Sequence, residues 1–159
     1  MSFDDWMLAL HVVSAFVLVA GLVLFWVLIV AVRRIDTPGA TLAMGPLTKV
    51  ADAAVGIGMG GTIALGVWLA FSVGGYDIWD GWIVAAIVLW FVGAALGRQA
   101  NEVYVPAVQK AQQLQSAGQT GPNGELLALN QASRGVVLQA LISVVVLLII
   151  VDMIWKPGA

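Results

Sequence analysis

Four long apolar segments alternate with short polar ones along this chain. The apolar segments cover residues 6–32, 51–73, 82–104 and 135–155. An α-helix needs roughly 20 apolar residues to cross the hydrocarbon core of a bilayer, and these segments have lengths of that order. These segments lack the alternation of apolar and polar residues that is typical of a strand in a membrane β-barrel. The pattern predicts an all-α membrane protein, a four-transmembrane-helix up-down-up-down bundle that occupies residues 1–159 as a single domain.

The third segment differs from the others because its strongly apolar part is short. This part begins at Trp82 and ends at Gly97, which gives a helix of about 24 Å at 1.5 Å per residue. The hydrocarbon core is roughly 30 Å thick. We therefore expect the polar residues after Gly97, up to the interfacial Tyr104, to complete the crossing.

The composition supports a chain whose solvent is the lipid bilayer. Hydrophobic residues make up 61% of the chain and charged residues 10%, and the mean hydropathy is +0.98. An ordinary soluble domain is about 45–50% apolar and 25% charged. The net charge of −2 argues against a nucleic-acid partner, which requires a basic patch. The absence of cysteine excludes disulfides and a thiol nucleophile.

The basic residues predict the orientation. Six of the seven Lys and Arg residues fall on the same predicted side of the membrane, namely Arg33, Arg34, Lys49, Arg98, Lys110 and Arg134. Cytoplasmic loops carry an excess of Lys and Arg, so we expect cytoplasmic loops at 33–50 and 105–134, both termini outside, and a location in the inner (plasma) membrane. Aromatic residues that prefer a membrane interface mark the outer boundary, namely Trp6, Tyr76, Trp79, Trp82 and Trp155.

Glycines within the apolar segments predict close helix packing. Gly56 and Gly60 are four residues apart in the second segment, and Gly93 and Gly97 repeat this spacing in the third. Small residues at this spacing lie on one face of a helix and let the backbones of two membrane helices approach closely. In the first segment, a stripe of mostly small residues also contains His11. It comprises Ser14, Ala15, Leu18, Gly21 and Leu22.

Ionisable residues inside a membrane are costly, so the few that occur are candidates for a site. His11 is the single histidine, and its stripe directs it into the bundle, where it could bind a haem iron or a quinone oxygen or carry a proton. The alternative is a structural role, in which a neutral imidazole is hydrogen-bonded to a backbone carbonyl or to a neighbouring helix. Asp52 and Arg98 are at the same predicted depth near the cytoplasm, and we expect Asp52 to form a structural ion pair with Arg98 or with Arg134.

Three stretches of the chain resemble a known group. These are LHVVSAFVLVAG at 10–21, the GGYDIW turn before the short third segment, and LLIIVDMIWKPG at 147–158. Together they resemble predicted bacterial integral membrane proteins of unknown function. That group is similar to the membrane domain of CopD copper-resistance proteins and to HemJ protoporphyrinogen oxidases.

The resemblance implies a candidate cofactor, but the sequence departs from the residue patterns of both HemJ-like oxidases and CopD-like copper-uptake proteins. In HemJ-like proteins a first-span histidine is associated with haem, so His11 is the residue that would bind haem b. A lysine also matters there, and no lysine lies inside the apolar segments of this chain. Copper uptake would require further His or clustered Met ligands, which the sequence lacks.

The sequence leaves three functional hypotheses. The first is a non-catalytic bundle that self-associates as a homo-oligomer or is accessory to a larger membrane complex. It follows from the glycine-rich faces, and from the absence of a phosphate-binding loop, an HExxH motif and a GxSxG motif. The second is a haem- or quinone-linked redox protein that uses His11. The third is a small transporter or channel with a path past Asp52 and Arg98.

Overall fold

The computed structural model describes residues 2–72 and 77–156, which form seven helices and no strand. The helices are α1 Phe3–Val32, α2 Pro38–Ala43, α3 Gly45–Ser72, α4 Gly81–Val103, α5 Val105–Ser116, α6 Gly124–Asn130 and α7 Ser133–Trp155. Four helical segments are long and apolar enough to cross a membrane, and they contain α1, α3, α4 and α7 as their long helices. The prediction of an all-helical chain with four long apolar helices is confirmed.

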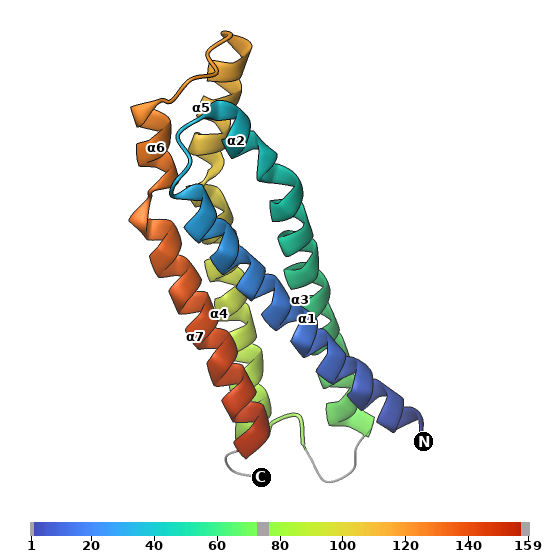
Figure 1. The fold of residues 1–159 in the computed structure, drawn as a ribbon. Coiled ribbons are helices and arrows are strands. Elements are labelled where there is room, and N and C mark those ends of the chain that lie inside the picture. Colours follow the sequence, from blue (N-terminus) through green and yellow to red (C-terminus); the bar gives the residue numbers. More distant parts are fainter. Residues whose placement is uncertain (1, 73–76, 157–159) are drawn as a thin grey trace.

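The long helices pack as two pairs. α1 lies along α3, α4 lies along α7, and α1 also crosses α7 (Figure 1). Contacts between α3 and α4 are sparse. The start of α1 and the end of α7 lie at the same end of the molecule, and the short helices α2, α5 and α6 lie at the other end (Figure 1).

The ends of the helices follow from local sequence. At the start of α1, Ser2 Oγ accepts the backbone N–H of Asp5 at 3.2 Å, and Asp5 Oδ2 accepts that of Ser2 at 2.6 Å. These two bonds form a capping box, which satisfies two of the free N–H groups of a helix start. Pro38 and Pro106 lie in the first turns of α2 and α5, where the missing N–H of proline costs nothing.

The segments 33–50 and 105–134, which we expect to be cytoplasmic loops, are largely helical. They contain α2, the first turn of α3, α5 and α6, and we call α2, α5 and α6 the helical cap. Its core consists of Ala107, Ala111, Leu114 and Leu126, with Leu42 and Leu129 against them. These helices are short and each has only one apolar side, so they bury it by packing on one another.

The polar end of the third apolar segment is helical, as the short length of its apolar part predicts. α4 continues through Arg98 and Asn101 to Val103, and α5 begins at Val105. Between them, the Tyr104 ring packs against Gly135 at the start of α7, so closely that a Cβ at Gly135 would overlap the phenol oxygen. The junction between α4 and α5 is therefore fixed against α7.

Charged and aromatic residues separate along the long axis of the molecule. All six basic residues of the predicted cytoplasmic face lie near or within the capped end, because they occur where α1 and α4 end, where α3 and α7 begin, and in α5. Trp6, Trp82 and Trp155 lie at the opposite ends of α1, α4 and α7. Trp6 and Trp155 are exposed, whereas Trp82 is buried. Val73 and Tyr76 lie outside the described residues.

Candidate functional site

α1 and α3 approach each other closely at Gly58. A Cβ at Gly58 would lie 2.5 Å from the backbone nitrogen of Leu18 and 2.6 Å from its Cα. Real Cβ atoms do not approach backbone atoms so closely. Gly58 and Leu18 are both buried. Only glycine at position 58 therefore allows α1 to lie directly on the backbone of α3.

Two further glycines extend this contact along both helices. A Cβ at Gly21 of α1 would lie 2.9 Å from the backbone nitrogen of Val55, and one at Gly61 of α3 would overlap the Ser14 hydroxyl. That hydroxyl donates to the Leu10 carbonyl at 2.8 Å, within its own helix. The Ser14 hydroxyl thus needs no partner on α3, and the contact is made by packing.

His11 lies at the edge of the α1–α3 contact, where Gly66 makes room for its ring. A Cβ at Gly66 would lie 3.1 Å from His11 Cε1 and 3.5 Å from Nδ1. The side chain is partly buried, its buried Nδ1 forms no hydrogen bond with the described residues, and the Thr62 backbone lies beside the imidazole. The structure thus places His11 on the α3 side of α1, in line with the small-residue stripe.

The glycines singled out by their spacing occupy different surroundings. A Cβ at Gly56, Gly60 or Gly97 would meet no atom within 4 Å. Gly93 is buried, and a Cβ there would lie in ordinary contact with Val145 Cγ1 at 3.5 Å. Of the four, only Gly93 lines a helix contact within the chain. The α1–α3 contact instead uses Gly58 and Gly61, which are three residues apart.

The structure does not bring Asp52 and Arg98 together as an ion pair. Both residues are exposed, and they lie on α3 and α4, whose mutual contacts are sparse. Neither charge is buried enough to require the other. A transport path past these two residues stays a prediction.

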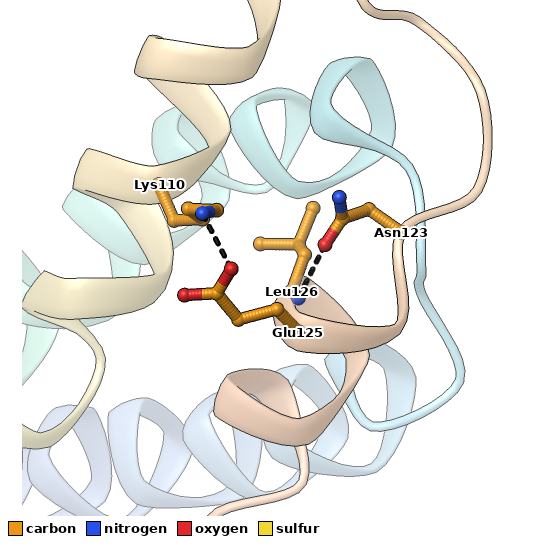
Figure 2. A network of polar contacts seen from close by, with 4 residues as sticks. All are labelled: Lys110, Asn123, Glu125 and Leu126. Carbon is orange, nitrogen blue, oxygen red and sulfur yellow. Dashed lines mark hydrogen bonds and ion pairs between the residues drawn. The ribbon is translucent and has the colours of Figure 1, made fainter.

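An ion pair between other residues, within the described part of the chain, lies in the helical cap. Lys110 Nζ of α5 is 2.5 Å from Glu125 Oε2 in the first turn of α6, and the two side chains face each other in Figure 2. Beside them, Asn123 Oδ1 accepts the backbone N–H of Leu126 at 3.0 Å and caps α6. Leu126 is fully buried between α5 and α6, so these polar contacts fix the start of α6 over the apolar core of the cap.

Residues 124–155 comprise α6 and α7, and we call them the α6–α7 arm. This arm contacts α1 through polar side chains. Gln139 Nε2 of α7 donates to the Leu22 carbonyl at 3.2 Å, and Trp26 Nε1 of α1 donates to Ser143 Oγ at 3.0 Å. The Gln139 side chain is 3% exposed. Neither bond was predicted, because a single polar residue in an apolar segment does not reveal its partner.

At the capped end, the same arm holds the segment that follows α1. Arg33 Nη1 donates to the Gln131 carbonyl at 2.9 Å, and Gln131 Nε2 donates back to the Arg33 carbonyl at 3.2 Å. Asn130 Nδ2 donates to the Ile35 carbonyl at 2.9 Å and to Thr41 Oγ1 at 3.1 Å. Asn130 is 1% exposed, so its contacts form a buried polar junction between α6 and the α1–α2 connection, whereas the bonds between Arg33 and Gln131 are exposed.

The described residues form two open hollows on the surface. Among residues 2–72 and 77–156, no three His, Asp or Glu side chains gather closely enough to hold a metal ion. A groove of about 470 Å³ runs along the last two turns of α1, lined by Trp26, Val27, Val30, Ala31 and Arg34. A smaller cavity of about 290 Å³ lies at the α5–α6 turn.

Comparisons of the chain with family models, with curated proteins and with solved structures found no match. The resemblance to CopD and HemJ proteins therefore stays a prediction from the residues that carry it.

Proposed function

We propose that this chain is a membrane-embedded helical bundle that self-associates through the open face of α3, with the helical cap in the cytoplasm and both termini outside. The observation that carries the proposal is the stripe of Gly56, Gly60 and Ala64. These residues are four apart, so they lie on one face of α3. All three are exposed, and the two glycines have empty space where a side chain would be.

Membrane insertion is supported by the large apolar side chains on the surface. Phe16, Ile57, Phe71 and Phe91 are between 63% and 71% exposed, and they come from α1, α3 and α4. Hydrocarbon tails would cover such side chains, whereas water would not tolerate so large an apolar surface. The separation of basic and interfacial aromatic residues to opposite ends supports the orientation.

Of the long segments, the one that contains α3 is the least covered by the rest of the chain. Within its most apolar stretch 6% of residues are buried inside the chain, against 28% in α1. In lipid, apolar surface alone does not drive helices together, and association depends on close van der Waals packing between small residues. The opposite face of α3 already packs on α1 in this way through Gly58. A second copy is the occupant that we propose for the open face.

The test is the association of purified chains in liposomes, measured by energy transfer between labelled copies as the lipid-to-protein ratio is varied. Wild type should associate, and replacing both Gly56 and Gly60 by isoleucine should raise the dissociation constant about tenfold or more, because the helices can no longer approach. Thermal unfolding of the monomer should not change, because no atom of the same chain lies within 4 Å of either added Cβ.

A matched control replaces two exposed alanines elsewhere, Ala20 of α1 and Ala95 of α4, by isoleucine. This pair adds the same β-branched side chains to the lipid-facing surface and should leave association unchanged. The proposal fails if wild type is monomeric at every lipid ratio. It fails equally if the glycine and alanine variants associate alike.

The alternative is a haem- or quinone-linked redox role for His11. The observation in its favour is the buried Nδ1 without a hydrogen-bond partner, since an unpaired imidazole nitrogen can bind a metal. The absorption spectrum of protein expressed with haem supplied, and purified in mild detergent, tests the haem version. A Soret band that His11→Ala abolishes would support it, and a sample without a Soret band would exclude it.

A further inference from the structure

The groove along the end of α1 has an apolar wall and a charged end. Trp26, Val27, Val30 and Ala31 form its wall over two turns of the helix, and Arg34 lies at its end, beyond Val32 where α1 stops. Val27 and Val30 are 58% and 55% exposed, so no other part of the chain covers them. All five residues that line the groove belong to α1 or its end, so the groove is a shallow, open surface along one side of the helix.

Two adjacent arginines at the end of α1 differ in what they bind. Arg33 is held by its reciprocal hydrogen bonds with Gln131 of the α6–α7 connection. The Arg34 guanidinium has no hydrogen bond or ion pair with any described residue, and its side chain is exposed at the groove. The chain therefore presents one uncommitted guanidinium next to an uncovered apolar surface.

The wall of the groove is held in place before any ligand binds. Trp26 Nε1 donates to Ser143 Oγ of α7 at 3.0 Å, and Ser143 in turn donates to the Gln139 carbonyl at 2.8 Å. The large ring of Trp26 is thus fixed relative to α7. A wall that is already ordered loses little conformational entropy when a ligand packs against it.

We propose that this groove binds an anionic phospholipid, with the phosphate on Arg34 and an acyl chain along Trp26 and Val30. Charge complementarity selects the occupant, because a planar guanidinium donates to phosphate oxygens bidentately. Basic pockets at the cytoplasmic end of membrane helices bind anionic headgroups in this way. The site rests on the membrane insertion proposed above, but it does not depend on self-association through α3.

The test is native mass spectrometry of the monomer in mild detergent, with phosphatidylglycerol and phosphatidylcholine of identical acyl chains as probes. We expect wild type to bind phosphatidylglycerol about fivefold more tightly, which corresponds to about 1 kcal/mol for one arginine at the membrane surface. Arg34→Gln should remove this preference. Because Arg34 is exposed, the variant should fold, which its thermal unfolding confirms independently.

Arg98→Gln is the matched control, because Arg98 is also exposed, removes the same charge, and does not line the groove. It should keep the lipid preference. Equal losses in the two variants would mean that general surface charge attracts the lipid, and would overturn the proposal. So would an Arg34→Gln variant that keeps the full preference.

A second arm tests the apolar wall and the source of the phosphate. Val30→Trp, with Arg34 intact, should lower the binding of both lipids, whereas Val88→Trp on the exposed surface of α4 should not. Inorganic phosphate should fail to displace phosphatidylglycerol, because it has no acyl chain for the groove. Displacement by phosphate, or equal effects of the two tryptophan variants, would overturn the proposal.

Discussion

α1 contacts two partners in this fold, and the two contacts are built differently. Against α3 it packs through small residues, so closely that Gly58 meets the backbone of Leu18. Against the α6–α7 arm it touches less extensively, and polar side chains such as Gln139 reach from one helix to the other. Glycine thus permits direct backbone packing, and where helices stay further apart a long polar side chain connects them.

This difference has an energetic consequence in the bilayer that we propose surrounds the chain. Dense packing is lost abruptly when an atom is inserted, because backbone cannot move aside. A hydrogen bond between membrane helices contributes little on average, about 0.6 kcal/mol, because the separated helices find other partners. We therefore expect small-residue packing to dominate the stability of α1, with polar bonds setting its register on α7.

Gly58→Val should have the largest effect. Its Cβ would lie 2.5 Å from the Leu18 nitrogen, so α1 and α3 must separate, and we expect a loss of about 3 kcal/mol or more. Thermal unfolding in detergent measures it.

Gly56→Val, measured under conditions in which the chain is monomeric, is the matched control on the same helix, where no atom lies within 4 Å of an added Cβ. It should change stability by less than about 0.5 kcal/mol. Comparable losses at the two positions would show that any β-branched residue in α3 lowers stability, whether or not it lies on the face that packs against α1.

Asn130→Ala should have an intermediate effect, because it removes a polar contact that is fully buried in the helical cap. The Ile35 carbonyl loses its donor at 2.9 Å, and Thr41 Oγ1 loses one at 3.1 Å. A buried group left without a hydrogen bond costs about 1–3 kcal/mol, so we expect a loss of about 2 kcal/mol.

Asn101→Ala provides the control, since Asn101 is exposed at the end of α4, and it should cost less than about 0.5 kcal/mol. Hydrogen exchange of the α6 amides locates the effect, which should be confined to the cap and the start of α7. If the two asparagine variants unfold at the same temperature, the buried junction contributes nothing.

Much of the helical framework could be predicted because length and hydropathy are local properties. The four long apolar helices follow from runs of apolar residues, and the helical extension beyond Gly97 follows from the short apolar part of that segment. The cap lies within the two segments that the sequence predicts as cytoplasmic loops. Its helices are amphipathic over only a few turns, and their stability comes from burying Leu126 against Ala107 and Ala111, which no local pattern reveals.

The contacts were harder to predict than the helices. Both Gly56–Gly60 and Gly58–Gly61 lie within one short stretch of α3, and spacing alone does not say which pair faces α1. That choice depends on the rotation of α3 about its axis, which Leu18 and Val55 set through packing. Asp52 and Arg98 were paired by predicted depth, but depth does not determine whether two helices touch.

Gln139→Met tests the weaker side of the comparison and should have the smallest effect of the three. Methionine keeps the length of the side chain but removes the donor to the Leu22 carbonyl, so we expect a loss of about 0.6 kcal/mol in unfolding measurements. The exposed Leu141→Met controls for adding a flexible side chain to α7 and should be neutral. A loss from Gln139→Met as large as that from Gly58→Val would reverse the ranking. The hydrogen bond would then hold α1 in the bundle as strongly as the glycine packing does, and the two contacts would differ in geometry but not in strength.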